Sequence, residues 1–272
     1  MTPTALFGLN GKTALVTGGA TGIGRMATTA LAAAGANVFI ASRKIDSCRA
    51  TADEINSLGV DGSVYAMHGD VGIDDGIEQL ISDLDARTEK LHILMNNAGR
   101  TWGAPLGSFP HSAWAKVFEL NVAGMFHLTQ RLISKLAESS TPDDPARVVN
   151  VGSVMGEIPM GDSAYSYATS KAAVHQMTRI LAKELAEQHI TVNALAPGPF
   201  QSGMTKFAIG EGSGADRVGK RVPLGRVGRP EDIAACMQFL CGAGGSYITG
   251  AIIPVSGGIN VTTGPSIFGE EE

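Results

Sequence analysis

The sequence predicts an α/β fold in which a mostly parallel sheet of seven strands is covered by helices on both faces. Two observations carry this prediction. Short apolar runs that have the length of buried strands alternate with longer segments of helical spacing along the whole chain. In addition, the first apolar run leads into a glycine-rich turn and an alanine-rich helix, which is how doubly wound sheets commonly begin.

The elements follow one another in regular order, and Gly35 is placed to end the first helix. The predicted strands are Lys12–Thr17, Asn37–Ala41, Ser63–Met67, Leu91–Met95, Arg147–Val151, Ile190–Leu195 and Ala251–Val255. Helices are predicted over 25–34, 46–58, 74–87, 111–136 and from Tyr167 to about Gln188. Because the chain has no internal repeat, long linker or composition break, we expect a single domain over residues 1–272.

The composition excludes several classes of function. A formal net charge of -5 without a basic cluster argues against a nucleic-acid partner. No apolar stretch approaches the roughly 18 residues that cross a bilayer, and no signal peptide is evident, so we expect a cytoplasmic protein with no membrane partner. Three cysteines are too few for a disulfide framework, and the six histidines show no metal-ligand spacing, so we predict no metal site.

The turn after the first strand has the residues of a dinucleotide-binding loop. Gly18 permits a tight turn, Gly22 lets the backbone approach a pyrophosphate, and Gly24 allows close packing of the helix. Thr21 and Ile23 lie between these glycines, where free N–H groups at the helix N-terminus attract phosphate. Although glycine turns are common, the strand before this one and the helix after it predict a Rossmann-type nucleotide site.

The end of the second strand predicts which nucleotide is bound. Ser42 stands about 20 positions beyond the glycines, where an acidic residue would hydrogen-bond the ribose of NAD. Arg43 and Lys44 follow, and an arginine can hold a 2′-phosphate with two hydrogen bonds. These residues favour NADPH/NADP+ as the cofactor. The alternative is that both cations belong to a solvated loop.

Tyr167 and Lys171 form the most informative pair in the chain. Four residues apart on a helix, the two side chains share one face. A neighbouring ammonium group favours the phenolate, so we expect Lys171 to lower the pKa of Tyr167 toward neutrality. Alone, such a pair would be interpreted as a surface contact, but it accompanies the nucleotide loop. Tyr165 has no matching lysine, because residue 169 is threonine.

An ordered set of motifs resembles the short-chain dehydrogenase/reductase family over essentially the full chain. The residues that carry the resemblance are Thr17–Gly24, Asp70, Asn96–Gly99, Asn121, Ser153, Tyr167, Lys171 and Pro197–Gly198. The resemblance implies an oxidoreductase and a homotetramer. It assigns catalysis to Asn121, Ser153, Tyr167 and Lys171, with Tyr167 as proton donor, Ser153 as hydrogen-bond donor to the substrate carbonyl and Lys171 also on the nicotinamide ribose. Asn121 is expected to break its helix locally and to hold a water that passes protons to Lys171.

The same resemblance distributes the remaining cofactor contacts. It implies that Asp70 and Val71 lie at the adenine, Asn97, Ala98 and Gly99 near the adenosine ribose, and Pro197, Gly198 and Thr205 near the nicotinamide.

Loops at 98–104, 145–148 and 196–200 resemble those of NADPH-dependent 3-oxoacyl reductases, which implies a 3-oxoacyl thioester or related ketone as substrate. A glycine-rich segment at about 200–225 is expected to form a lid. The candidate apolar walls are Trp102, Met155, Ile158, Met160 and Phe207, and the candidate basic residues for an acyl carrier are Arg217, Lys220, Arg221, Arg226 and Arg229. Two alternatives stay open: a sugar or cyclic alcohol dehydrogenase, and a catalytically silent NADP(H)-binding regulator.

Overall fold

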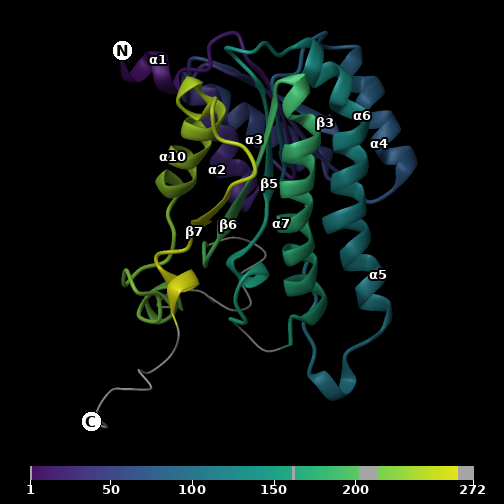
Figure 1. Cartoon of the computed structure of the whole chain (residues 1–272), viewed down its shortest axis with the longest axis vertical. Helices are drawn as coiled ribbons and strands as arrows, with labels where there is room; N and C mark the ends of the chain where they lie inside the picture. Colours follow the sequence, from purple (N-terminus) through teal and green to yellow (C-terminus); the bar gives the residue numbers. More distant parts are fainter. Residues whose placement is uncertain (1, 161–162, 202–213, 263–272) are drawn as a thin grey trace.

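The computed structural model describes residues 2–160, 163–201 and 214–262, and it contains one seven-stranded sheet (Figure 1). The strands are β1 (Thr13–Thr17), β2 (Asn37–Ser42), β3 (Ser63–His68), β4 (Ile93–Asn96), β5 (Ala146–Val151), β6 (Ile190–Pro197) and β7 (Ile252–Val255). Their order is β3-β2-β1-β4-β5-β6-β7, and every neighbouring pair is parallel. The predicted α/β class is confirmed, and the strand ends differ from prediction by at most two residues.

Helices cover both faces of this sheet. One face carries α2 (Gly22–Ala33), α3 (Ile45–Ser57) and α10 (Pro230–Cys241), and the other carries α4 (Asp74–Asp85), α6 (Met125–Glu138) and α7 (Tyr165–Leu185). Figure 1 shows α2 and α10 on one side of the strands and α6 and α7 on the other. Crossover helices join the strands of a parallel sheet, and these helices therefore cover both of its faces. Shorter helices are α1 (Pro3–Phe7), α5 (Ser112–Phe118) and α9 (Gly214–Gly219).

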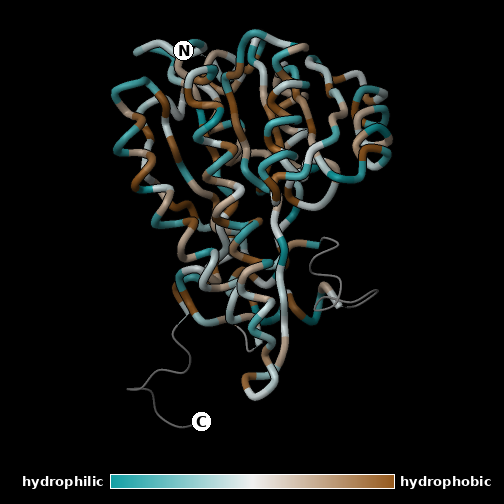
Figure 2. The backbone as a smooth tube through the Cα atoms, turned by 90° about the vertical axis from the view of Figure 1, so that its right-hand side faces the viewer, coloured by the Kyte–Doolittle hydropathy of each residue, from teal (hydrophilic) through white to brown (hydrophobic). Residues whose placement is uncertain are grey.

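Two apolar cores result from the alternation of side chains along each strand. In β1, Ala14 and Val16 belong to the core beneath α2, whereas Leu15 belongs to the core beneath α4 and α6. In β2, Ile40 and Phe39 divide in the same way. Figure 2 shows apolar positions recurring along the helices between hydrophilic ones, as expected for helices that pack one face on a sheet.

The long helix predicted at 111–136 is interrupted. A π-helical turn, Glu119–Gly124, separates α5 from α6 and contains Asn121. Gly124 is required in this turn, because a Cβ atom there would lie 1.8 Å from the carbonyl oxygen of Val71. The local break that the resemblance implied for Asn121 is therefore present.

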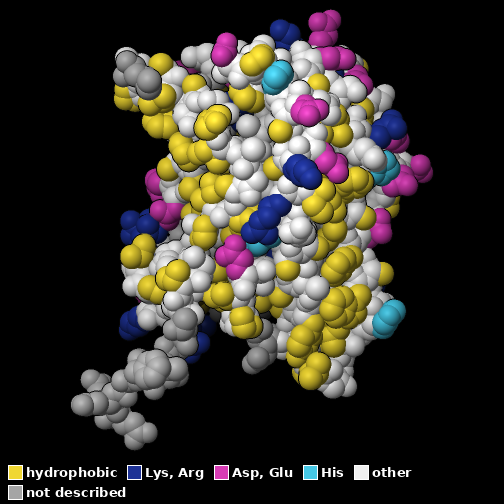
Figure 3. All heavy atoms as spheres, viewed as in Figure 1, with side chains coloured by type: hydrophobic (Ala, Val, Ile, Leu, Met, Phe, Trp, Pro, Cys, Tyr) yellow, Lys and Arg dark blue, Asp and Glu magenta, His cyan; other side chains and the backbone are white. Residues whose placement is uncertain are grey.

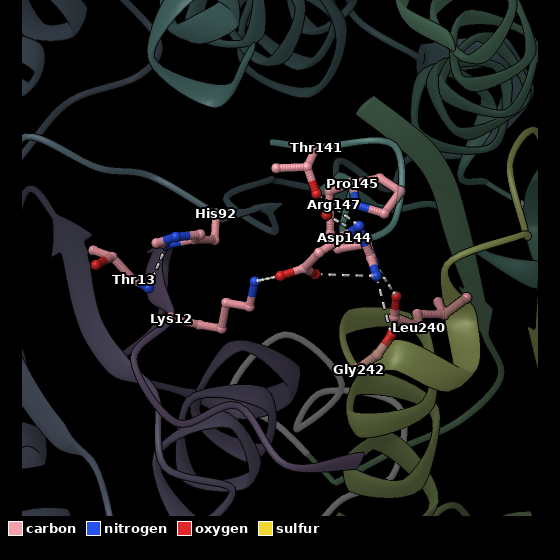
Figure 4. Close-up of polar contacts among 9 residues, drawn as sticks. All are labelled: Lys12, Thr13, His92, Thr141, Asp144, Pro145, Arg147, Leu240 and Gly242. Atoms are coloured by element: carbon pink, nitrogen blue, oxygen red, sulfur yellow. Dashed lines mark hydrogen bonds and ion pairs between the residues drawn. The ribbon is translucent and has the colours of Figure 1, made fainter. Parts of the chain in front are cut away.

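At the amino ends of the strands, a buried arginine joins β5 to α10 (Figure 4). The Arg147 guanidinium donates through Nε to the carbonyl oxygen of Leu240 and through Nη2 to that of Gly242, both at 3.1 Å, and through Nη1 to that of Pro145. Asp144 forms an ion pair with Lys12 and lies 3.9 Å from Arg147. These contacts satisfy carbonyl groups at the C-terminus of α10.

The three cysteines are free thiols; Cys48 and Cys241 are buried, whereas Cys236 is half-buried. Among the described residues, no helix is long and apolar enough to cross a membrane, and no cluster of potential metal ligands occurs.

Candidate active site

A cavity of about 710 Å³ opens at the carboxyl ends of the strands, where ligands of doubly wound sheets collect. It brings together residues from β1 to β6 and from α7. The predicted site residues that line it are Gly18, Thr21, Gly22, Ile23, Ser42, Arg43, Lys44, Asp70, Val71, Asn97, Ala98, Gly99, Ser153, Tyr167, Lys171, Pro197 and Gly198. Gly24 and Asn121 lie outside the lining, and Thr205 lies outside the described residues.

The glycine turn has the backbone that its sequence requires. Gly18 and Gly22 adopt positive φ angles of 65° and 53°. Gly24 packs directly against this turn, because a Cβ atom there would lie 2.3 Å from the carbonyl oxygen of Gly18. Asn97 closes the arrangement by donating from Nδ2 to the carbonyl oxygens of Thr17 and Gly18, at 2.9 and 3.1 Å. Asn97 thus ties the end of β4 to the turn.

The helix that follows the turn offers unpaired donors. Thr21 is the N-cap of α2, and its side chain makes no capping hydrogen bond. The first N–H groups of an α-helix have no partner within the helix, and the helix dipole places partial positive charge there. Thr21, Gly22 and Ile23 line the cavity at this point, so the helix end faces the space where a pyrophosphate would lie.

At the end of β2, Ser42 lines the cavity and also makes hydrogen bonds within its own turn. The Ser42 hydroxyl accepts from the Lys44 N–H at 3.1 Å and from the Cys48 thiol at 3.3 Å, so it mainly shapes the turn. Arg43 and Lys44 are exposed cavity residues, and within the described ranges neither forms an ion pair. Ser47, in the first turn of α3, also lines the cavity, and sequence reasoning missed it. A small polar residue beside two cations was its only signal.

Asp70 and Val71, which the resemblance assigns to the adenine, lie just beyond the end of β3. Asp70 accepts from the Gly72 N–H through Oδ1 at 3.0 Å, which folds the chain back behind the strand. Val71 is buried beside it, and both residues line the cavity.

Ser153 and Tyr167 meet at the opposite end of the cavity. Ser153 follows β5 and is the N-cap of a short 3-10 turn, Val154–Gly156. Its hydroxyl oxygen accepts from the Met155 N–H at 3.2 Å. A hydrogen bond from Ser153 to the phenol stabilises phenolate and lowers the pKa of Tyr167, but burial raises that pKa more strongly. The net pKa is raised from the ordinary value of tyrosine, so the predicted lowering is wrong for this arrangement.

Lys171 is buried under the tyrosine ring. Its side chain is 5% exposed, its Nζ lies 5.6 Å from the centroid of the Tyr167 ring, and it donates to the carbonyl oxygen of Val151 at 2.7 Å. Burial lowers the pKa of Lys171 to about 8. Desolvation acts against the charged form of both groups, raising the tyrosine pKa and lowering the lysine pKa. Tyr167 and Lys171 lie close together, as their spacing in the sequence predicts. The spacing does not predict that both side chains are desolvated.

Asn121 lies behind the cavity and holds one of its walls. Its Oδ1 accepts from the Arg100 N–H at 2.8 Å, and its Nδ2 donates to the Arg100 carbonyl oxygen at 2.9 Å and to Ser170 Oγ at 3.0 Å. A Cβ atom on Gly99 would lie 3.2 Å from Asn121 Oδ1 and 3.7 Å from Lys171 Nζ. The π-helical turn therefore joins the end of β4 to α7 next to the lysine.

The apolar walls agree with the sequence only in part. Met155 and Met160 line the cavity, whereas Trp102 and Ile158 do not, and Phe207 lies outside the described residues. Tyr165 also lies outside the lining and packs edge-to-face on Phe109. The lining also includes residues that sequence reasoning did not assign to the site, among them Thr101, Leu120, Val154, Ala164, Pro199 and Phe200.

The predicted lid and its basic residues are only partly described, because residues 202–213 lie outside the described ranges. Arg226 is engaged by Asp232 in two hydrogen bonds of 2.6 and 2.9 Å, so it does not offer a free charge to an acidic partner. Arg217, Lys220, Arg221 and Arg229 are exposed.

Comparison with known proteins agrees with this geometry. A family profile described as "Enoyl-(Acyl carrier protein) reductase" matches residues 18–260. The rhamnolipids biosynthesis 3-oxoacyl-[acyl-carrier-protein] reductase of Pseudomonas aeruginosa is 44% identical, over 94% of this chain and 98% of that protein. The chain belongs to the short-chain dehydrogenase/reductase family. The family consists of oxidoreductases, and membership accounts for the order of the motifs along the chain.

Two further relatives extend the family comparison. The 3-oxoacyl-[acyl-carrier-protein] reductase FabG of Aquifex aeolicus is 34% identical, over 92% of this chain and 98% of its own length. The solved structure described as the Pseudomonas aeruginosa RhlG/NADP active-site complex superimposes with a TM-score of 0.90 at 43% identity, covering 94% of this chain and 99% of that one.

Proposed function

We propose that this chain is an NADPH-dependent ketoreductase that reduces the keto group of a 3-oxoacyl thioester, or of a related ketone, to a secondary alcohol. The observation that supports the proposal is that Ser153, Tyr167 and Lys171 line the same cavity as the glycine turn. Relatives named as 3-oxoacyl-[acyl-carrier-protein] reductases support the substrate class, and the RhlG/NADP complex supports the cofactor.

The residues present fit NADP(H) along the length of the cavity. The free N–H groups at the start of α2 suit a pyrophosphate. Gly18 and Gly22 have positive φ angles, so any other residue at either position would have a strained backbone. Arg43 and Lys44 suit a 2′-phosphate, because both line the cavity and within the described residues neither is neutralised by an acidic partner. Thr205, which the family resemblance places near the nicotinamide, stays a prediction.

The proposed mechanism assigns proton and charge control to the chain. When bound, NADPH supplies the hydride that reaches the carbonyl carbon. Tyr167 donates its phenolic proton to the carbonyl oxygen as negative charge develops there, and its raised pKa keeps that proton in place at neutral pH. Ser153 donates a hydrogen bond to the same oxygen and orients the carbonyl. Lys171 would hold the ribose of the cofactor and, with a pKa of about 8, can supply a proton to Tyr167 after the phenol has donated its own.

Asn121 acts in this mechanism by holding the end of β4. Its three hydrogen bonds fix Arg100 against α7, which keeps Gly99 close to Lys171. We keep the predicted water beside Asn121 as part of the proposal.

The walls near Tyr167 favour an acyl chain over a sugar. Among the described lining residues, Val154, Met155, Met160, Pro199 and Phe200 have apolar side chains, which offer no hydrogen bonds to the hydroxyl groups of a polyhydroxylated ligand. A silent regulator is disfavoured for a different reason: a protein that only binds nucleotide needs no phenol hydrogen-bonded to a serine at the end of the cavity. We also propose a homotetramer in the cytoplasm.

The decisive experiment compares oxidation of NADPH and NADH by the purified protein with 3-oxoacyl thioesters of coenzyme A and of acyl carrier protein, and with keto sugars. We expect turnover with the thioesters and NADPH. Turnover only with keto sugars would overturn the substrate class, and tight NADPH binding without turnover of any ketone would favour the regulator. Light scattering after size exclusion would test the tetramer.

A further inference from the structure

His175 is a buried histidine that the proposed mechanism does not use. It lies on α7 one helical turn beyond Lys171, its residue is 3% exposed, and it faces the end of β5. A buried histidine is tolerated when its ring nitrogens have hydrogen-bond partners or when its surroundings keep the ring neutral. One contact of the His175 ring is with the backbone of Ser153.

The Ser153 N–H donates to His175 Nε2 at 3.4 Å. Two glycines make room for the ring on either side of this contact. A Cβ atom on Gly152 would lie 2.2 Å from Nε2, and one on Gly156 would lie 3.0 Å from Cε1. Gly152 is held from the other side as well, because its N–H donates to the carbonyl oxygen of Leu195 at 2.8 Å. The ring therefore fills the space that the backbone around Ser153 leaves open.

The hydrogen bond from Ser153 specifies the tautomer of the ring. Since Nε2 accepts, the proton of the neutral imidazole resides on Nδ1, which faces Glu157 Oε1 at 3.8 Å. The charged groups around the ring are Glu157, Lys171 and Arg179, and burial together with the two cations lowers the pKa of His175 to about 4. The ring thus stays neutral, and Nε2 stays an acceptor, throughout the neutral range.

We propose that His175 is a positioning residue for Ser153: its ring packs on Gly152 and Gly156 and accepts the Ser153 N–H, which holds the serine hydroxyl at the phenol of Tyr167. The Ser153 hydroxyl hydrogen-bonds the phenol, and its oxygen accepts from Met155, so a shift of the serine backbone would disturb both contacts. Only the kinetic prediction from this inference rests on the proposed function. The contact between Ser153 and the phenol of Tyr167 can be measured without turnover.

The test compares His175→Phe, which keeps a flat ring without an acceptor, with His175→Gln, whose Oε1 can reach the position of Nε2. We expect His175→Phe to lower kcat about 10- to 100-fold, because misplacing a group that orients the reacting carbonyl is costly, with the KM for NADPH within about twofold of wild type. His175→Gln should recover most of the loss. Thr178→Val is the matched control: Thr178 lies on the same helix as His175 and accepts a buried hydrogen bond from Asn150 Nδ2 of β5, so this variant also loses a buried hydrogen bond, and its kcat should equal that of wild type.

A second measurement follows the phenol itself. Because the hydrogen bond from Ser153 lowers the pKa of Tyr167, losing it in His175→Phe should raise the phenolate pKa, measured as the ultraviolet titration difference from Tyr167→Phe. A folded His175→Phe protein with wild-type kcat and an unchanged phenolate pKa would overturn the inference. If His175→Phe does not fold, His175→Asn replaces it: its side chain is too short to reach Nε2, so equal kcat for Asn and Gln would overturn the inference. Absence of turnover in wild type would instead refute the proposed function, and the phenolate titration would still decide the role of His175.

Discussion

Strand β5 has a buried cation near each end, and the two differ in how their donors are used. At the amino end, Arg147 is 2% exposed and donates to three carbonyl oxygens, with Asp144 nearby (Figure 4). At the carboxyl end, Lys171 is 5% exposed, donates to the carbonyl oxygen of Val151, and otherwise faces the cavity. Two buried cations, Arg147 on β5 and Lys171 on α7, thus lie near opposite ends of one strand and use their donors differently.

The difference separates a structural cation from one that can react. An ammonium group has three donors, so Lys171 keeps hydrogen-bonding capacity for a ligand, whereas the planar guanidinium of Arg147 is engaged on several sides. Burial lowers the pKa of both side chains, yet only Lys171, at about 8, is brought near neutrality. Burial alone therefore does not identify a functional charge; the unused donors and the adjoining cavity do.

The charged side chains on the surface can be compared with these two buried cations. Figure 3 shows lysine, arginine and acidic side chains interspersed over one face of the molecule, where exposed ion pairs are solvated and contribute little. The exposed pair Arg25–Glu54 is of this kind.

The largest expected effect tests the reactive end. Tyr167→Phe removes the phenol above Lys171 and should lower kcat about 10³-fold, because a positioned proton donor contributes roughly 10²–10⁴-fold. The Kd for NADPH, measured by fluorescence titration, should stay within about twofold of wild type. Strong residual reduction would mean that another group donates the proton.

The next effect tests the structural end. Arg147→Met removes the arginine donor to the Leu240 carbonyl oxygen and one of the two donors to the Gly242 carbonyl oxygen, and we expect it to lower the free energy of unfolding in urea by about 3 kcal/mol. The kcat of the folded protein should be unchanged, because the site is at the other end of the sheet. Asp144→Asn is the control: Asp144 is 49% exposed, so its loss should cost under about 1 kcal/mol. Equal costs for the two variants would contradict the structural role of the arginine.

A pH series measures the burial of Lys171. Its folded pKa of about 8 lies below the ordinary 10.5, so the unfolded chain binds more protons between these values and stability rises with pH across that window. The unfolding free energy of wild type relative to Lys171→Met should therefore increase by about 2 kcal/mol from pH 8 to 10.5. A flat difference would show that the ammonium group is solvated.

The smallest effect concerns an exposed cation of the cavity. Arg43→Ala should raise the KM for NADPH about tenfold and leave the KM for NADH nearly unchanged, because only NADPH carries a 2′-phosphate. Binding of 2′,5′-ADP and of 5′-AMP, measured by calorimetry, gives the same comparison without turnover. Equal loss for both nucleotides would assign Arg43 to the solvated loop that the sequence leaves open. Ser47→Asp should act in the same direction, since a carboxylate there would repel the phosphate.

Much of the site could be predicted from the sequence because it depends on local geometry. The spacing of Tyr167 and Lys171 places both on one helix face, and the glycine turn predicts its own positive φ angles. The alternation of strands and helices predicts a parallel sheet. The glycine turn and the helix that carries Tyr167 are therefore expected at the same edge of that sheet, where its strands end. Each of these inferences needs only neighbouring residues or a repeating pattern.

The tertiary structure decided which groups are desolvated and what they contact. The raised pKa of Tyr167 and the contact of His175 with Ser153 both depend on segments far apart in sequence or on their packing. The burial of Arg147 against α10 is of the same kind, as its partners lie more than 90 positions away. Desolvation is a property of everything that surrounds a group, and no local pattern of residues determines it.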